Sequence, residues 1–573
     1  MWINLEHGAK RRLNSLLTKP LSFDAVDFYE KTPSINSYDD NLRYKLLSLS
    51  RLFNEAKQTI LLEMPIIYSE IRHGINLIGP NDFSSNTIPI TTLYLGSIPI
   101  ESFTLNTLCC DINNQQIERI LEFNDITDTQ IHTNKISISV SNLIKFFTLS
   151  EILYLSLSGL AEIDIFRNEI TITPNSNKYE NFFKPKWFAN FWESMSSISN
   201  IALFNMIPTS SPEAPFIKST LQSVSDFLMD KTFSINSQYL TDKITSSETY
   251  IWMKLVSDLI AVLFYFQLRL NRNWISFSEL ESFDISKDNI MLLKSIQQNA
   301  NSSDRIFSFT NNRVSLINPC ISMHSRKLIE TLVKIYNAKE FDNIMGDFFH
   351  KSYIANYIKK SINKNTRRYI LHGEIVAHDV FKNNKDGDID LILEDTVANR
   401  FIFMQIKYIR NAGRPFLRGD VEYLTNKHIQ HGIYQLKSIA DFHKEGCLDQ
   451  ILINKNISHC EFKNTIYMLV TNITNLDFQK DRNNIVHYEW NTLRNLLQDG
   501  SCYYGDSNSP LNYIEWRHSK PLPLEAPGEV IDILMTHNPA LKQISAEQIF
   551  MTKDIQSQFE LNGTTYKSIG LGI

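Results

Sequence analysis

Residues 369–410 read YILHGEIVAHDVFKNNKDGDIDLILEDTVANRFIFMQIKYIR, and the interpretation of the whole chain starts from this stretch. It contains three β-prone runs, Tyr369–Val380, Ile389–Glu394 and Phe401–Tyr408, which are rich in Ile, Val, Leu and Phe. Asn, Lys, Asp and Gly separate the runs, and these are turn-forming residues. The pattern predicts three consecutive strands joined by turns.

Polar residues occupy particular positions in these strands. Period-two alternation places Gln405 and Lys407 on one face of the third strand, and Asp388 and Asp390 on one face of the second. Buried polar groups cost free energy unless they are paired or bind a metal. Mg²⁺ favours carboxylate, amide and main-chain oxygens together with retained water. The sequence therefore predicts a Mg²⁺ site between the strands, which Mn²⁺ could also occupy.

An acid on one strand, Asp390, is followed on the next strand by Gln405-Ile406-Lys407. This order resembles the signature of the PD-(D/E)xK nuclease superfamily, and the Q-x-K form looks like the variant of Mrr-type restriction enzymes. The resemblance covers roughly residues 341–472. It implies a metal-dependent endonuclease that hydrolyses phosphodiester bonds of DNA, in restriction or anti-phage defence. Gln405 replaces the commoner glutamate and removes one negative charge from the expected metal site.

The resemblance also implies a role for each residue of the signature. Asp390 would be the central metal ligand, and the side-chain oxygen of Gln405 and the main-chain carbonyl of Ile406 would complete the protein's share of the shell. Lys407 would orient the attacking water or stabilise charge that develops on the phosphate. Metal-activated water attacking in line is the general physical route to such cleavage.

Two further carboxylates are candidates for this site. Glu374, in the first strand, fits the position of the family's additional acid, as a third catalytic and metal-binding carboxylate. Asp342 and Asp347 on the preceding helix are its rivals. Asp388 either assists Asp390 or is a strand-entry residue after Gly387.

Basic residues flank the three strands on both sides. A local cluster of Lys and Arg in a chain of acidic balance is what a phosphate track requires. On the helix that follows, His428 and His431, with Gln435 one turn further on, could reach phosphate or metal, or could be ordinary polar-face residues. The predicted nucleic-acid-binding residues are Lys359, Lys360, Arg367, Arg368, Arg410, Arg414 and Arg418.

Hydrophobic periodicity gives the order of elements around the strands. A helix over Phe341–Ile362 precedes them, an amphipathic helix over Val421–His443 follows them, and Thr465–Thr471 reads as a fourth strand. Helix, three strands, helix and strand make an αβββαβ core, the restriction-endonuclease-like order that the resemblance implies. The fold class predicted for the chain is α/β and α+β, in several domains.

The remainder of the chain divides into further regions by composition and hydrophobic periodicity. Residues 1–175 read as an α+β domain, and residues 176–325 as a mostly helical region that begins with a Pro-rich linker. Within it, Phe307–Ile317 resembles a hairpin with an Asn-Asn turn, and Trp274–Ile317 is compatible with a winged helix. Residues 326–480 form the nuclease-like domain. Residues 481–573 form an extension expected to pack on it.

Composition is that of an ordinary globular protein. The 573 residues are 43% hydrophobic and 21% charged, with a net charge of −5, so any nucleic-acid contact must be a local patch. The six cysteines include no C-x-x-C, which favours reduced thiols and a cytoplasmic location, and the start of the chain resembles no secretory signal. The apolar run Tyr250–Leu268 contains Lys254 and Asp258, which favours a buried helix over a membrane span.

Two functions of different classes remain open at this point. The first is the Mg²⁺-dependent nuclease, with DNA as substrate before RNA and with a partner protein or a homo-oligomer compatible with it. The second is a catalytically inactive, nuclease-like subunit for nucleic-acid binding or assembly. Gln405 in place of glutamate is the feature that keeps the second function open.

Overall fold

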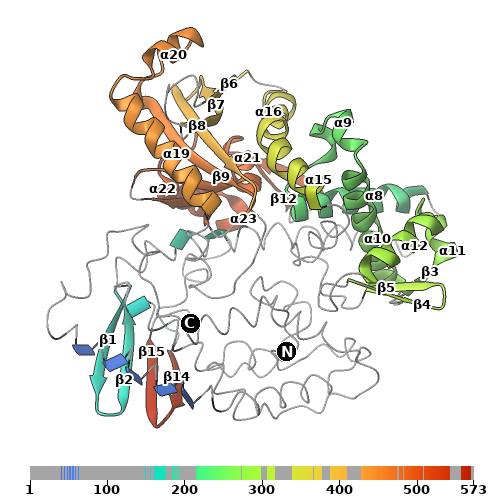
Figure 1. The fold of residues 1–573 in the computed structure, drawn as a ribbon, viewed down its shortest axis with the longest axis horizontal. Helices are drawn as coiled ribbons and strands as arrows, with labels where there is room; N and C mark the ends of the chain where they lie inside the picture. The colour runs from blue at the N-terminus through green and yellow to red at the C-terminus, as the bar shows by residue number, and fades with distance from the viewer. Residues whose placement is uncertain are drawn as a thin grey trace.

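The computed structural model describes residues 160–175, 215–298, 306–316, 338–376, 387–409, 427–542 and 556–569, with short gaps inside some ranges. It also describes single residues between 41 and 62, 149 and 156, and 184 and 192. These parts mix helices and strands, as predicted (Figure 1). Most of the α+β domain predicted over residues 1–175, and residues 317–337, lie outside the described residues.

Among the described residues the largest β structure is a six-stranded mixed sheet, in the order β10-β11-β9-β8-β7-β6. Strands β6, β7 and β8 are antiparallel neighbours, whereas β9 runs parallel to both β8 and β11. The bounds are Tyr369–Ile375 (β6), Ile389–Asp395 (β7), Arg400–Lys407 (β8), Thr465–Thr471 (β9), Gln479–Lys480 (β10) and Val486–Glu489 (β11). The predicted strands at 389–394, 401–408 and 465–471 are confirmed.

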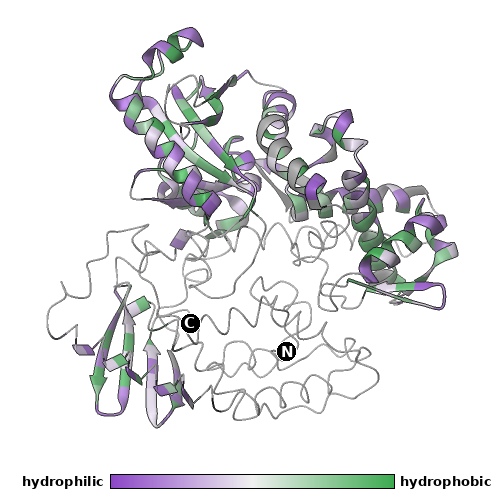
Figure 2. Ribbon diagram, viewed as in Figure 1, coloured by the Kyte–Doolittle hydropathy of each residue, from purple (hydrophilic) through white to green (hydrophobic). Residues whose placement is uncertain are grey.

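Helices cover both faces of this sheet. The face that carries Phe403 and Leu469 packs on α19 (Lys427–Lys444), which crosses in front of β8 in Figure 1. The other face, with Met404 and Met468, belongs to a second cluster that includes residues of the preceding helical run. Figure 2 shows these strands mostly hydrophobic and α19 two-faced, as a helix between core and solvent should be. Their bounds confirm the predicted order of helix, three strands, helix and strand.

The helix predicted over Phe341–Ile362 is present as one helical run with π-helical parts. Its segments are α15 (Ala338–Asn343), η7 (Ile344–Tyr353), α16 (Ile354–Tyr357) and η8 (Ile358–Ile362). The remaining elements of this half are α20 (Asp449–Asn454), η9 (Phe462–Asn464), α21 (Trp490–Leu496), β12 (Cys502–Asp506), β13 (Ser509–Trp516), α22 (Pro527–His537) and α23 (Pro539–Lys542).

Helices dominate the middle of the chain. The elements are α8 (Pro215–Phe233), η5 (Ser237–Tyr239), α9 (Asp242–Thr245), α10 (Glu248–Leu270), β3 (Trp274–Ser276), α11 (Phe277–Glu281), α12 (Lys287–Gln298), β4 (Phe307–Thr310) and β5 (Arg313–Leu316). The predicted Asn-Asn hairpin is confirmed, because Asn311 and Asn312 both have positive φ, at 46° and 58°, between β4 and β5.

Helix α10 has the length and composition of a membrane span over Glu248–Phe266, but 78% of that window is buried inside the protein. The ammonium of Lys254 donates to the carboxylate of Asp258 and, at 2.9 Å, to the hydroxyl of Ser225 on α8. The two charges that interrupt the apolar run are therefore paired at a helix–helix contact, as the prediction of a buried helix requires.

The middle region and the sheet are joined by one continuous core rather than separated near residue 325. A single cluster of buried side chains extends from Leu221 on α8 to Val470 on β9. Arg494 on α21 donates to both carboxylate oxygens of Asp230 on α8, at 3.0 and 2.6 Å. The boundary predicted near residue 325 therefore marks a change in sequence composition, but the two regions on either side of it pack together.

The carboxy-terminal extension divides between two parts of the molecule. Leu522 and Val530 pack in the core beside the six-stranded sheet, as predicted. The last hairpin, β14 (Gln556–Leu561) and β15 (Thr564–Ile569), instead joins β1 (Ala161–Phe166) and β2 (Glu169–Pro174) in a four-stranded sheet. This corrects the expectation that the whole extension packs on the nuclease-like domain.

Candidate functional site

The candidate site lies where β7 and β8 separate. The last backbone pair of the two strands is Leu391 with Met404, although both strands continue beyond it. One residue further along, Asp390 Oδ2 accepts the main-chain N–H of Ile406 at 2.7 Å. A carboxylate therefore takes the place of a strand carbonyl, and its charge is held against the β8 backbone.

Gln435 on α19 connects the polar residues of the two strands. Its Oε1 accepts hydrogen bonds from Gln405 Nε2 at 3.0 Å and from Lys407 Nζ at 3.1 Å, and its Nε2 lies 3.4 Å from Asp388 Oδ2. Gln405 and Lys407 thus share the face of β8 that packs on α19, as strand alternation predicted. Asp388, which directly precedes β7, contacts the same helix. The prediction that Gln405 and Lys407 share one face of β8 is confirmed.

The chemistry of these partners fixes the orientation of both amides. An ammonium can only donate and a carboxylate can only accept, so the oxygen of Gln435 must face Lys407 and its nitrogen must face Asp388. Gln405 must then present its own nitrogen to that oxygen. Its Oε1 is left buried and without a hydrogen-bond partner in the described part of the chain, although Gln405 is only 1% exposed.

Electrostatics at the site reflect burial against nearby acids. Burial lowers the pKa of Lys407 below its usual value, and the charges of Asp390 and Asp388 offset part of that effect. Both acids are half-buried, as is Lys407. The arrangement places an ammonium, two carboxylates and an unsatisfied carbonyl oxygen within one small, partly dehydrated region.

The donor set suits a hard divalent cation. An unpaired buried oxygen costs free energy, and a cation that it ligates would recover that cost. Asp390 and the carbonyl groups of Gln405 and Ile406 are the oxygen types that Mg²⁺ takes. Within the described ranges no three His, Cys, Asp or Glu side chains form a metal-binding group, so a site here depends on amide and main-chain oxygens.

Glu374 lies on the neighbouring strand β6. It is exposed, between Gly373, which pairs with Ile392, and Ile375, which pairs with Ile389. The register of β6 shifts on both sides of Gly373, which has a φ of 77°. Glu374 is therefore level with Asp390 along the sheet, and its place as third acid stays a prediction. The side chains of its rivals Asp342 and Asp347 lie outside the described residues.

Two residues that support the site carry weak sequence signals. Gly432 on α19 lies so close to β8 that a Cβ there would be 3.1 Å from Lys407 Cε and 3.0 Å from Leu469 Cδ1. Asn472 receives the N–H of Ile409 at 2.6 Å and donates to its carbonyl at 3.0 Å, which anchors the chain after Lys407. A glycine inside a helical pattern was the available clue to the first.

Replacing Gly432 with alanine should displace the aliphatic stem of Lys407, because the new methyl group needs its space. If the site has the nuclease activity that the sequence predicts, we expect cleavage to slow by about tenfold to a hundredfold, since a misplacement of about 1 Å can cost that much. Single-turnover cleavage of a DNA duplex measures the effect. Gly528→Ala is the matched control, because a Cβ at Gly528 meets no atom within 4 Å. An equal loss of cleavage rate in Gly432→Ala and Gly528→Ala would contradict the role of Gly432 in positioning Lys407.

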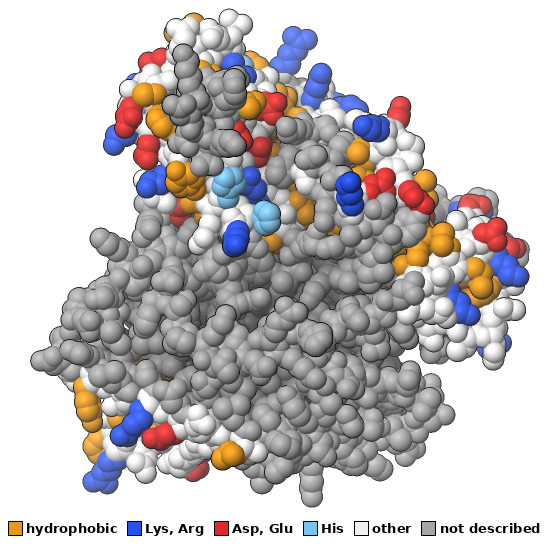
Figure 3. Space-filling model, viewed as in Figure 1, with side chains coloured by type: hydrophobic (Ala, Val, Ile, Leu, Met, Phe, Trp, Pro, Cys, Tyr) orange, Lys and Arg blue, Asp and Glu red, His pale blue; other side chains and the backbone are white. Residues whose placement is uncertain are grey.

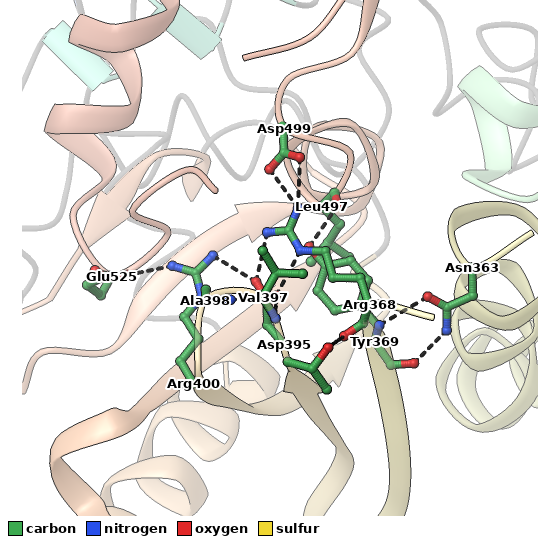
Figure 4. A network of polar contacts seen from close by, with 11 residues as sticks. Asn363, Arg368, Tyr369, Asp395, Val397, Ala398, Arg400, Leu497, Asp499 and Glu525 are labelled. Atoms are coloured by element: carbon green, nitrogen blue, oxygen red, sulfur yellow. Dashed lines mark hydrogen bonds and ion pairs between the residues drawn. The ribbon is translucent and has the colours of Figure 1, made fainter. Parts of the chain in front are cut away.

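Arg368 does not belong to the predicted phosphate track. It is buried, and its guanidinium binds both carboxylate oxygens of Asp395 at 2.8 Å and those of Asp499 at 2.7 and 2.8 Å (Figure 4). Arg400 adds bonds to Asp395 at 3.3 Å and to Glu525 at 3.0 Å. This placement corrects the prediction, because a guanidinium used in this way has no free edge for phosphate.

The other predicted basic residues divide into two groups. Lys359, Lys360 and Arg367 are exposed near the start of β6, and Figure 3 shows Lys and Arg side chains gathered on that side, over α16 and β6. Arg410, Arg414 and Arg418 lie outside the described residues. His428 and His431 are exposed on α19, the helix that carries Gln435.

Comparison with known proteins adds no relative from which a function could be read. The chain matches no protein-family model, no curated protein and no solved structure.

Proposed function

We propose that this protein is a metal-dependent nuclease that hydrolyses phosphodiester bonds of DNA at the site formed by Asp390, Gln405 and Lys407. The observation that carries the proposal is the buried Oε1 of Gln405, which has no hydrogen-bond partner in the described part of the chain and stands beside a carboxylate and an ammonium. In a structural core an unpaired buried oxygen only costs free energy, whereas at a metal site it can serve as a ligand. Restriction or anti-phage defence is the setting proposed from the resemblance.

Each residue has a distinct task in this proposal. When bound, the metal would polarise the phosphate and activate water. Asp390, Gln405 and the carbonyl of Ile406 would hold it, with Glu374 as the additional acid. Lys407, held by Gln435, would stabilise charge on the phosphate, and the charges of Asp390 and Asp388 offset part of the lowering of its pKa by burial. Packing against α19 limits water around these groups, which strengthens their electrostatic effect.

Exposed basic residues near the start of β6 would contact the DNA backbone. Replacing Lys359, Lys360 and Arg367 together with alanine should reduce the salt dependence of DNA binding. The slope of log affinity against log salt should fall by about one per lost phosphate contact, or up to about three in total. Fluorescence anisotropy with a labelled duplex measures it. An unchanged slope would assign these residues to an ordinary solvated surface.

The direct test uses purified full-length protein and supercoiled plasmid, with Mg²⁺, Mn²⁺ or EDTA. The proposal expects nicked or linear product with metal and intact plasmid with EDTA. Intact plasmid under every condition, from folded protein that binds DNA, would overturn it.

One observation favours the inactive, nuclease-like subunit as second candidate. Gln435 satisfies the ammonium of Lys407 and the amide nitrogen of Gln405, so most of the polar cluster is paired without any ligand. Such a cluster could stabilise a binding subunit. DNA binding with the predicted salt dependence but no cleavage in Mg²⁺ or Mn²⁺ would identify it.

A further inference from the structure

A second candidate surface lies at the far end of α10, apart from the six-stranded sheet. There, α10, β3, α11, α12 and the β4–β5 hairpin follow one another, and the three strands pair in the order β3-β5-β4 (Figure 1). This is the connectivity of a winged helix: a helix-turn-helix, α11 to α12, followed by a hairpin. In helix-turn-helix proteins the second helix enters the DNA major groove.

Helix α12 and the hairpin are fixed to each other by one buried side chain. Gln297, near the end of α12, accepts the N–H groups of Ile306 at 3.0 Å and Phe307 at 2.6 Å, and its amide nitrogen donates to the carbonyl of Phe307. At the tip, the carbonyl of Asn312 accepts the N–H of Phe277 on α11 at 2.9 Å. The helix and hairpin therefore have one relative orientation before any ligand binds.

The outer face of α12 carries side chains of types that can contact base edges. Its buried positions are Ile290, Leu293, Ile296 and Gln297, whereas Ser295 and Gln298 are exposed on the opposite side of the helix. Asn and Gln can make two hydrogen bonds to adenine in the major groove, and apolar groups contact the thymine methyl. Met291 and Leu292, each 45% exposed, supply apolar groups on the same helix.

Charge on this surface favours a polyanion once internal pairs are considered. Two acids are neutralised locally: Glu279 by Arg272 at 2.6 Å, and Asp284 by Lys218 at 3.2 Å. Glu281 and Asp288 are exposed. Against these two acids stand three cations, which have no acidic partner among the described residues: Lys287, Lys294 and Arg313.

Arg313 is held where a wing would meet the DNA backbone. Its guanidinium lies 3.7 Å from the centroid of the Trp274 ring, and it is exposed at the start of β5. Stacking on an aromatic face orders a guanidinium and leaves its N–H edge for phosphate.

The surface is also rigidly connected to the sheet. Beyond the Asp230–Arg494 pair, Asn236 donates its N–H to the Tyr353 hydroxyl at 3.0 Å, and the Tyr239 and Tyr357 rings lie 4.4 Å apart. These contacts join the α8–α10 helices to η7 and α16, which cover the sheet. A duplex bound at α12 would therefore have a fixed position relative to Asp390.

We propose that α12 and the β4–β5 hairpin bind double-stranded DNA, with α12 in the major groove and Arg313 on the backbone, and select the sequence near which the chain acts. The role in choosing a cleavage position rests on the proposed nuclease function. The binding itself does not.

The binding test uses the full chain carrying Asp390→Asn, so that no cleavage is needed. Duplexes selected from a random-sequence pool should bind more tightly than the unselected pool. Ser295→Ala with Gln298→Ala should reduce this preference by about tenfold to a hundredfold, as loss of base contacts does. Lys294→Ala with Arg313→Ala should weaken all duplexes and lower the salt slope by about two. Lys243→Ala, on exposed α9 at the opposite end of α10, should change neither.

Two outcomes would overturn the inference. One is no preference for any duplex, and the other is an unchanged preference in the Ser295/Gln298 variant whose circular dichroism and melting match the parent. Cleavage is scored separately with the unmodified site. Plasmid cleavage without α12-dependent binding would leave the nuclease proposal intact and remove this one. Binding that depends on α12, with no cleavage, would support DNA binding by α12 and remove the nuclease proposal.

Discussion

Replacing Asp390 with asparagine should abolish DNA cleavage and leave the fold intact. Asparagine keeps an oxygen that can accept the Ile406 N–H, now bonded to Asp390 at 2.7 Å, but it removes the charge that would hold the metal. A loss of about a thousandfold or more corresponds to about 4 kcal/mol in the barrier. Single-turnover cleavage, with circular dichroism for folding, gives both results.

Lys407→Met should have an equally large effect for a different reason. Methionine keeps an aliphatic stem to pack beside Gly432, but it lacks the ammonium that Gln435 positions. DNA affinity should remain nearly unchanged, because the task of Lys407 is at the reacting phosphate.

The matched controls are Asp449→Asn and Lys444→Met, which alter exposed residues of α20 and α19. Cleavage that survives both site substitutions in folded protein would exclude the proposed site. Equal loss in the controls would show that charge changes on this domain act non-specifically.

Replacing Arg368 with methionine should produce the largest loss of stability. It would leave the carboxylate of Asp395, which is 0% exposed, with only the 3.3 Å bond from Arg400 among its arginine partners. Breaking a buried pair from one side costs about 3–5 kcal/mol. Urea denaturation should therefore show a clearly lower midpoint.

Arg367→Ala is the control, because this neighbouring side chain is exposed and surface substitutions usually change stability by about 0.5 kcal/mol or less. Similar midpoints for both variants would contradict the structural role given to Arg368.

The Arg368 effect should also depend on pH. Burial alone would raise the pKa of Asp395, but the hydrogen bonds and charge of Arg368 hold it below its ordinary value. A lowered carboxyl pKa contributes stability above the unfolded value, about 3.9, and this is lost as pH falls through the folded value. The stability gap between wild type and Arg368→Met should narrow below about pH 4.

Strand alternation was sufficient to predict that Gln405 and Lys407 share one face of their strand. Gln405 and Lys407 both contact Gln435 because side chains two apart share a face, which is a local property of any strand. The Asn311-Asn312 turn could also be predicted, since asparagine tolerates positive φ. Helix bounds near β6 followed from periodicity for the same local reason.

Contacts between residues far apart in the chain could not be predicted from the sequence. Arg367 and Arg368 look alike in a polar turn, and burial of the second depends on Asp395 and Asp499, the latter 131 residues away. Lys567 on β15 binds Glu169 on β2 across 398 residues. No local pattern records such pairings, so the place of the last hairpin could not be predicted.

The most direct test of the central claim is Mn²⁺ binding by metal-free full-length protein, measured by isothermal titration calorimetry. Gln405→Leu should weaken binding by about tenfold or more, because it removes the unpaired Oε1 while Lys407 keeps its bond to Gln435. Gln450→Leu, on exposed α20, should bind Mn²⁺ as wild type does. Equal Mn²⁺ affinity in wild type and Gln405→Leu, or no binding by wild type, would contradict a metal site at Gln405.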